Sequence, residues 1–319
     1  MSKPNTVTAD AVVSAPAPVV SVSPVVLSVP GRPVDLPLRV SAPVTERELP
    51  IILLSHGHGN SNYLSSLIGC APLADFWAAR GFVVIQPTHL DSSTISVDRN
   101  GPEGPLFWRS RVEDMRRILD QLDRVEAAVP ELSGRLDRSR IAAAGYSLGG
   151  HTAAMLLGMR ATDPHDGTAV DLADARIKAG VLLAAPGRGA DLTAVAAQRF
   201  PFLKGPSFAA MTTPALVVVG DKDVNPNFTD RADWRADAYS LSPGPKSLLT
   251  LFGAEHSLGG VAGYDAAETT DEHPARVAAI QRLTWAYLRT ALYPEESAWP
   301  AARAAFMDAP DPLGRIESK

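Results

Sequence analysis

Long apolar runs recur along the chain from about residue 50, and each is bounded by glycine, proline or polar residues. A run of this kind, without alternating polar positions, is typical of a strand that is buried on both faces of a sheet. Six runs fit this description: 50–60, which ends in a glycine-rich segment, 81–90, 140–145, 177–186, 214–220 and 247–252.

Between these runs, apolar residues recur every three or four positions, which predicts amphipathic helices. The clearest case is the segment 108–129, whose apolar positions include Met115, Ile118, Leu122, Val125 and Val129. Further helices are expected over 62–80, 148–159 and 273–291, and the polar residues 91–107 are expected to form a long loop. Strand and helix therefore alternate, which predicts an α/β fold with a mostly parallel central sheet and helices on both faces.

The two ends of the chain depart from this alternation. Residues 24–29 and 34–40 are short β-type runs on either side of the turn sequence PGRP, so we expect an N-terminal antiparallel hairpin. No linker divides the chain. We expect a disordered N-terminus over 1–15, a single domain over 16–293, and a tail over 294–319 that packs on the domain as a short helix.

Composition narrows the class of protein. The 319 residues suffice for one large domain with a well-buried core, and the net charge of −5 without a basic stripe argues against a nucleic-acid partner. No stretch reaches the ~18 apolar residues of a membrane span, and polar residues and prolines interrupt the N-terminus where a secretory signal would be apolar. We therefore expect a cytoplasmic protein, with secretion as the less favoured alternative. Cys70 is the single cysteine, which excludes an intramolecular disulfide, and it is expected to be a small buried apolar residue.

Ser147 lies in a glycine-rich turn, directly after an apolar run and directly before a helical one. The flanking glycines are Gly145, Gly149 and Gly150. The pattern Gly-x-Ser-x-Gly is not specific on its own, but strand, turn and helix in this order are the setting of a nucleophile elbow, in which a strained turn exposes the serine hydroxyl. The glycines fit this reading because strand and helix pack closely around such a turn. The amide of Leu148, at the start of the helix, would then face a developing oxyanion.

A serine hydroxyl needs a general base, and the base needs an orienting carboxylate. In a fold with a nucleophile elbow, the order along the chain is serine, then aspartate or glutamate, then histidine, each after a strand. Asp221 and Asp223 follow the run 214–220, and His256 follows the run 247–252. We favour Asp223 over Asp221 as the acid, because it lies far enough from the strand to reach a neighbouring loop, whereas Asp221 is placed to cap the turn.

Other histidines compete with His256 for the role of base. His56 and His89 end strands that precede the serine, and they are expected to hydrogen-bond loop backbone. His151 lies one helical turn after Ser147 and is expected to point away from it. His165 and His273 fall in polar segments and are expected on the surface.

The glycine-rich segment HGHGN (56–60) follows the first parallel strand. The second oxyanion donor of a nucleophile-elbow fold comes from this loop, so we assign it to the amide of His58. Its imidazole is expected to line the pocket by packing rather than to transfer protons.

The segments LLSHGHGN, GYSLGG, VVVGDKD and GAEHSLGG resemble the α/β-hydrolase fold, over residues 24–293. Together with the helical sequence RVEDMRRILDQL (111–122), they resemble more narrowly the dienelactone-hydrolase-like serine esterases, which are related to platelet-activating-factor acetylhydrolases, chlorophyllases and bacterial polyester hydrolases. The resemblance implies Ser147 as nucleophile, Asp223 as acid and His256 as base, with the amides of His58 and Leu148 as oxyanion hole. It implies no metal and no cofactor.

The chain also departs from that group. Dienelactone hydrolases use a cysteine nucleophile where this chain has serine, so their substrate is not implied. His58 stands where the group often has another residue type. The segment between Pro186 and Pro214 is too short for the large helical lid of many lipases. The resemblance implies that Arg111 and Asp114 are structural.

Aromatic residues in segments near the expected mouth of the site predict an apolar or aromatic ester pocket, without a cluster of Arg or Lys that could hold a phosphate or a dianion. They are Tyr63, Phe107, Trp108, Phe200, Phe202, Phe208 and Phe228. We therefore expect a serine esterase, monomeric or homodimeric, that cleaves small-molecule esters with short to medium or aromatic groups.

Three other functions are compatible with the same sequence. An acyltransferase or thioesterase would use the same three side chains. A non-catalytic binding protein could retain the scaffold without the chemistry. A metal-dependent hydrolase could use His56 and His58, which form a His-x-His pair at a strand end, but would leave the glycine-flanked serine unexplained.

Overall fold

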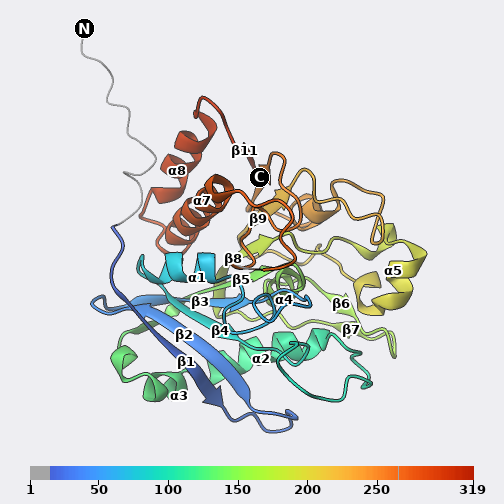
Figure 1. Cartoon of the computed structure of the whole chain (residues 1–319), viewed down its shortest axis with the longest axis horizontal. Helices are drawn as coiled ribbons and strands as arrows, with labels where there is room; N and C mark the ends of the chain where they lie inside the picture. The colour runs from blue at the N-terminus through green and yellow to red at the C-terminus, as the bar shows by residue number, and fades with distance from the viewer. Residues whose placement is uncertain (1–14, 265) are drawn as a thin grey trace.

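The structure is a computed structural model that describes residues 15–264 and 266–319, so the expectation of disorder over 1–15 concerns residues outside the described part, residue 15 excepted. Within these residues, nine strands form the main sheet: β1 (Val19–Leu27), β2 (Leu36–Pro43), β3 (Leu49–Ser55), β4 (Val83–Pro87), β5 (Leu136–Tyr146), β8 (Ile177–Leu183), β9 (Ala215–Gly220), β10 (Lys246–Leu251) and β11 (Gly314–Ser318). Their order across the sheet is β1-β2-β4-β3-β5-β8-β9-β10-β11 (Figure 1). Two further short strands, β6 (Ala161–Thr162) and β7 (Ala169–Val170), pair with each other.

The six strands in the middle of the sheet, from β4 to β10, run parallel to one another. The strands β1 and β2 form an antiparallel hairpin, with Leu27 opposite Leu36, and β2 continues antiparallel along β4. The predictions of an α/β fold, of a mostly parallel sheet and of an N-terminal antiparallel hairpin are therefore confirmed.

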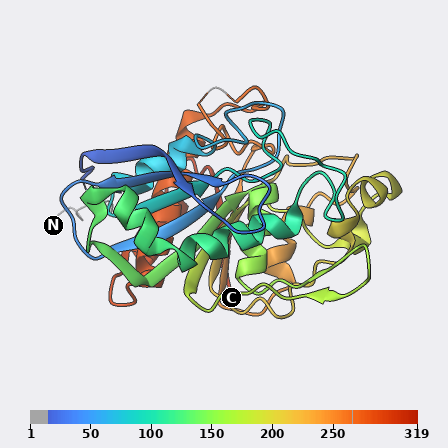
Figure 2. The same ribbon diagram turned by 90° about the horizontal axis from the view of Figure 1, so that it is seen from below.

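Helices cover both faces of the sheet. They are α1 (Ala71–Ala78), α2 (Trp108–Asp120), α3 (Leu122–Ala128), α4 (Leu148–Leu156), α5 (Ala194–Arg199), α6 (Asp237–Ser240), α7 (Pro274–Leu292) and α8 (Ala298–Met307). Figure 1 shows α1, α7 and α8 together on one side of the sheet, and Figure 2 shows α2 and α3 crossing its other side.

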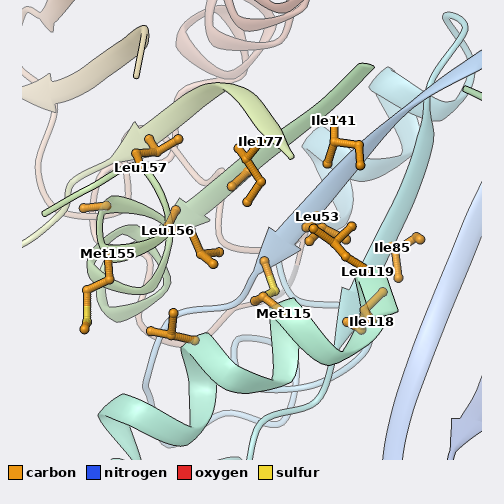
Figure 3. Close-up of a cluster of buried hydrophobic side chains, with 14 of the residues drawn as sticks. Leu53, Ile85, Met115, Ile118, Leu119, Ile141, Met155, Leu156, Leu157 and Ile177 are labelled. Atoms are coloured by element: carbon orange, nitrogen blue, oxygen red, sulfur yellow. The ribbon is translucent and has the colours of Figure 1, made fainter. Parts of the chain in front are cut away.

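The two faces bury two separate apolar cores, because neighbouring strand residues point to opposite sides. In β3, Leu53 packs into the core beneath α2 and α4, whereas Ile52 packs into the core beneath α1 and α7. Figure 3 shows the first core, where Met115 and Ile118 of α2 meet Leu53 and other strand residues. Burial on both faces explains why the central strands read as uninterrupted apolar runs.

Two predicted helices differ from the structure. The segment 62–80 is helical only over α1, because the preceding residues form turns and Cys70 has a left-handed φ of 59° just before the helix begins. Pro72 in the first turn of α1 fits a helix start. The segment 108–129 contains two helices, because Gln121 has a non-helical φ of −121° between α2 and α3.

The tail after Tyr293 contains α8, as expected, and also β11, which the sequence analysis missed. This strand pairs antiparallel with β10, with Ile316 opposite Leu249, and so forms the edge of the main sheet. Its sequence, GRIES, contains a single large apolar residue and gives no clear alternating pattern.

Cys70 is fully buried, as predicted. Among the helices of the described residues, none combines the length and the apolar character that a bilayer crossing requires.

Candidate active site

The turn between β5 and α4 places Ser147 at the carboxyl end of a central strand. Ser147 has a φ of 52° and a ψ of −117°, a region that non-glycine residues rarely occupy and that costs of order 1–3 kcal/mol. Its amide donates to Leu183 O of β8 at 2.8 Å, and its carbonyl accepts from the His151 amide at 3.2 Å. The backbone of this turn is thus strained, and hydrogen bonds at both the N–H and the C=O group of Ser147 hold it in place.

The glycines around this turn make room for backbone rather than for a ligand. A Cβ atom on Gly145 would lie 2.0 Å from Gly149 O, and a Cβ atom on Gly149 would lie 2.0 Å from Ser55 O, at the end of β3. Both contacts are with backbone, which cannot give way cheaply. The first turn of α4 can therefore pack against the ends of β3 and β5 only because these positions carry no side chain.

Three side chains from distant parts of the sequence meet at this end of the sheet. His256 Nε2 lies 3.0 Å from Ser147 Oγ, and His256 Nδ1 lies 2.8 Å from Asp223 Oδ2. The Asp223 side chain is 2% exposed and follows β9, whereas the His256 side chain is 38% exposed and follows β10. The carboxylate fixes Nδ1 as the protonated nitrogen, which leaves Nε2 free to accept the proton of the serine hydroxyl.

Arg235 is a further member of this group that sequence reasoning missed. Its Nε lies 3.2 Å from Asp223 Oδ2, the same oxygen that His256 contacts, and its side chain is 8% exposed. It also donates to Ala184 O at 3.1 Å. Nothing in the local sequence WRAD distinguishes this arginine from the many exposed ones, so only the fold reveals its position.

The electrostatic environment keeps the carboxyl ionised and the imidazole neutral. Burial acts to raise the pKa of Asp223, but the hydrogen bond from His256 and the positive charge of Arg235 outweigh it and lower that pKa. Burial lowers the pKa of His256 most, and the charge of Arg235 lowers it further. A neutral imidazole next to a serine is the protonation state that a general base requires.

The loop that carries His256 is held by two residues that the sequence analysis did not single out. Tyr146 OH donates to His256 O at 3.0 Å, and the Tyr146 ring packs against the histidine ring at 5.3 Å between centroids. Asp271 Oδ2 accepts from the amides of Glu255 and Gly259, on either side of His256. The backbone on both sides of His256 is therefore held in place, in addition to the contact of its ring with Asp223.

Asp221, the other candidate acid, lies elsewhere. It is exposed, and its Oδ1 accepts from the Gly253 amide at 2.7 Å. It therefore joins the loop after β9 to the loop after β10 and does not contact His256.

The two predicted oxyanion donors lie at the same cavity as the serine. His58 and Leu148 both line this cavity together with Ser147 and His256. Neither backbone amide donates a hydrogen bond to any residue that the structure describes. Both amides are thus available to a ligand oxygen.

The cavity has a volume of about 300 Å³. Its aromatic lining consists of Phe200, Phe202 and Phe228, with Phe200 and Phe228 stacked at 5.3 Å between centroids. The segment from β8 to β9 supplies part of this wall; it contains one α-helix, the six-residue α5, and two short 3-10 helices, Gly189–Asp191 and Pro201–Lys204.

Four predicted pocket residues do not line this cavity. Trp108 and Phe208 are buried in the core beneath α2, where Trp108 stacks behind Phe202. Phe107 forms the start of α2, and Tyr63 is an exposed residue beside Gly263. The lining also includes two arginines, of which Arg235 pairs with Asp223 and Arg199 lies over the Phe200 ring.

The remaining histidines do not contact Ser147 Oγ. The two ring nitrogens of His56 are hydrogen-bonded to backbone, at Gly57 O and at the His89 amide, as predicted. The His89 ring instead contacts two side chains, Ser55 and Asp114. His151 packs edge-on against Phe202, and burial lowers its pKa to about 3.

His165 is exposed, whereas His273 is half-buried and caps α7 by accepting from the Arg276 amide. Over residues 15–264 and 266–319, no group of three or more His, Cys, Asp or Glu side chains is arranged so that it could hold a metal ion.

No protein-family model matches this chain, and a search of curated proteins found no similar sequence.

Proposed function

We propose that this protein is a serine hydrolase of the α/β-hydrolase fold that cleaves carboxylic esters with short to medium or aromatic groups. One observation carries the proposal: the chain of contacts from Asp223 Oδ2 through both nitrogens of His256 to Ser147 Oγ, at 2.8 and 3.0 Å. Hydrogen-bond distances of this kind between nucleophile, base and orienting acid are the signature of an activated serine.

The reaction proceeds in two steps. His256 takes the hydroxyl proton of Ser147 as Oγ forms a bond to the ester carbonyl carbon, and the amides of His58 and Leu148 hold the oxyanion. The bond from carbon to the alcohol oxygen then breaks, and His256 gives its proton to the departing alcohol. Water then attacks the carbonyl carbon of the acyl-enzyme while His256 takes one of its protons. The bond from carbon to Ser147 Oγ breaks, and His256 returns the proton to Oγ, which releases the carboxylic acid and restores the free serine. Asp223 stays ionised and stabilises the imidazolium of both steps.

The volume and the lining of the cavity favour a small substrate. A volume of about 300 Å³ lies at the lower end of the range for ligand pockets, and its three phenylalanines offer an apolar surface to an acyl or alcohol group. No residue of this mechanism depends on a metal or an organic cofactor.

The proposal is tested with purified protein and an activated short-chain ester such as p-nitrophenyl butanoate. The protein is expected to release p-nitrophenol, and Ser147→Ala is expected to lower kcat by at least about 10³-fold, because the remaining catalysis comes only from binding and the oxyanion hole. Thr152→Ser, on the same helix but outside the cavity, serves as the folded control. Equal turnover by the Ser147→Ala protein would refute the assignment.

A further inference from the structure

His58 forms a second histidine–aspartate pair at the same cavity. Its Nδ1 lies 3.1 Å from Asp91 Oδ2, and its ring is 40% exposed while Asp91 is fully buried. The residue lines the cavity beside Ser147 and His256. Two histidines, each backed by a buried carboxylate, therefore lie at one serine, although the mechanism above uses only one of them as a base.

Asp91 is held in place by a buried arginine. Arg111 Nη1 donates to Asp91 Oδ1, and Arg111 Nη2 donates to His56 O; all three groups are buried. Burial acts to raise the pKa of Asp91, but the charge of Arg111 and the hydrogen bond from His58 outweigh it and lower that pKa to about 2. The carboxylate is therefore an ionised acceptor near neutral pH.

An ionised acceptor at Nδ1 decides which nitrogen of His58 carries the proton. The neutral ring donates Nδ1–H to Asp91, which leaves Nε2 as a hydrogen-bond acceptor. Within the described residues, Nε2 has no hydrogen-bond partner. The His58 ring is therefore held at the cavity by a buried, ionised carboxylate that fixes its orientation.

We propose that His58 Nε2 accepts a hydrogen bond from a hydroxyl group of the substrate, so that the preferred substrates are esters that carry a hydroxyl group close to the ester carbonyl. The hydroxyl must be close to the carbonyl because the backbone amide of the same residue, His58, is the proposed donor to the carbonyl oxygen. This inference rests on the proposed function and names the substrate class of that site.

The test compares matched ester pairs that differ in one hydroxyl. Ethyl 3-hydroxybutanoate is paired with ethyl 3-methylbutanoate for the acyl side, and 2-hydroxyethyl butanoate is paired with propyl butanoate for the alcohol side. Hydrolysis is followed by pH-stat titration, and kcat/KM is measured for both members of each pair. Differences in intrinsic ester reactivity cancel when the ratio within a pair is compared between protein variants.

Two variants separate recognition from structure. His58→Asn retains an amide nitrogen at the position of Nδ1, so it still pairs with Asp91, but it lacks a group at the position of Nε2. His58→Gln places a polar group at the position of Nε2 and gives up the group at Nδ1. For at least one pair, we expect His58→Asn to lower the hydroxyl preference about two- to tenfold, the value of one neutral hydrogen bond, and His58→Gln to lower it less.

The results that would overturn this inference differ from the result that would overturn the proposed function. An unchanged preference in His58→Asn for both pairs, or a larger loss in His58→Gln than in His58→Asn, would overturn the inference and leave the proposed function intact. Wild-type protein that cleaves p-nitrophenyl butanoate but neither hydroxylated ester would also overturn it. Failure to cleave any of the five esters would overturn the proposed function itself.

Discussion

The contact between Arg235 and Asp223 allows a quantitative prediction. Replacing Arg235 with methionine keeps most of the apolar stem and removes the charge. At an effective dielectric constant of about 20, unit charges 3.2 Å apart attract by about 5 kcal/mol, and the desolvation of both groups offsets part of this. Removing one partner of a buried pair typically costs about 3–5 kcal/mol, and Asp223 keeps its hydrogen bond from His256. We expect a loss near the lower value, about 3 kcal/mol, in the free energy of unfolding measured by urea denaturation.

The same substitution is expected to move the pH dependence of catalysis. The positive charge of Arg235 opposes protonation of His256 and lowers its pKa, after the larger effect of burial. Without this charge the pKa of His256 rises, so the base becomes protonated at a higher pH. The acidic limb of the profile of kcat/KM against pH, measured with p-nitrophenyl butanoate, should therefore shift to higher pH in Arg235→Met.

A matched control is offered by Arg32, which forms a second buried pair. Its Nε lies 3.0 Å from Asp114 Oδ1, the two side chains are 1% and 0% exposed, and neither lines the cavity. Arg32→Met should destabilise the protein to a similar extent and leave the acidic limb where it is. An acidic limb that stays in place in Arg235→Met, or that shifts equally in both variants, would refute this account of the electrostatics.

Four further predictions follow from the packing and charges of the site. Gly149→Ala should lower the free energy of unfolding, measured by urea denaturation, by more than about 3 kcal/mol and kcat/KM for an ester by at least about 100-fold, because its Cβ would meet Ser55 O. Smaller losses of both quantities would show that the helix can shift to make room. Phe228→Ala should widen the cavity and raise kcat/KM for octanoate relative to butanoate esters, and an unchanged ratio would place the acyl group elsewhere. Deletion of residues 309–319 should expose the edge of β10 and cause concentration-dependent aggregation in light scattering, whereas a stable monomer would contradict this role. Because the pKa of Asp223 is lowered in the folded state, its contribution to stability is present above the unfolded value of about 4 and is lost as the pH falls through the folded value; Asp223→Asn should therefore flatten the acidic side of a stability–pH curve.

The parts of the fold that the sequence predicted well are those with a strong physical pattern. The strand β9, for example, is buried on both faces, so its residues Ala215–Gly220 form one apolar run with clear limits. The order of serine, aspartate and histidine, each after a parallel strand, placed the three side chains at one edge of the sheet, because parallel strands end at the same edge. The choice of Asp223 over Asp221 rested on its greater distance from the end of the strand, and in the structure Asp223 is the aspartate that contacts His256.

Other features depend on contacts that no local pattern encodes. Arg235 lies next to Asp223 because the chain after β9 turns back toward the sheet, and its sequence neighbours give no sign of this. The pocket prediction failed for Trp108 and Phe208 because an aromatic residue in a connecting segment is equally suited to the core, and these two are buried there. The edge strand β11 was missed because a single apolar residue, Ile316, is enough where one face is exposed.

His58 combines a feature that the local sequence predicts with one that depends on a contact between distant residues. Its position after β3 could be read from the glycine-rich segment, and its amide was assigned from that position alone. Its partner Asp91 lies 33 positions along the chain, after β4, and nothing in the sequence links the two residues. The prediction that the His58 imidazole only packs against the pocket wall therefore could not include the buried carboxylate that orients the ring.

The central claim is that Ser147 Oγ becomes a nucleophile through His256, and covalent labelling tests it most directly. The protein is incubated with a p-nitrophenyl alkylphosphonate, and the site of the adduct is mapped by mass spectrometry of peptides. The account predicts one phosphonyl group, on Ser147, with labelling strongly slowed in His256→Ala and absent in Ser147→Ala. An adduct on another residue, or labelling of Ser147 that proceeds equally fast without His256, would contradict it.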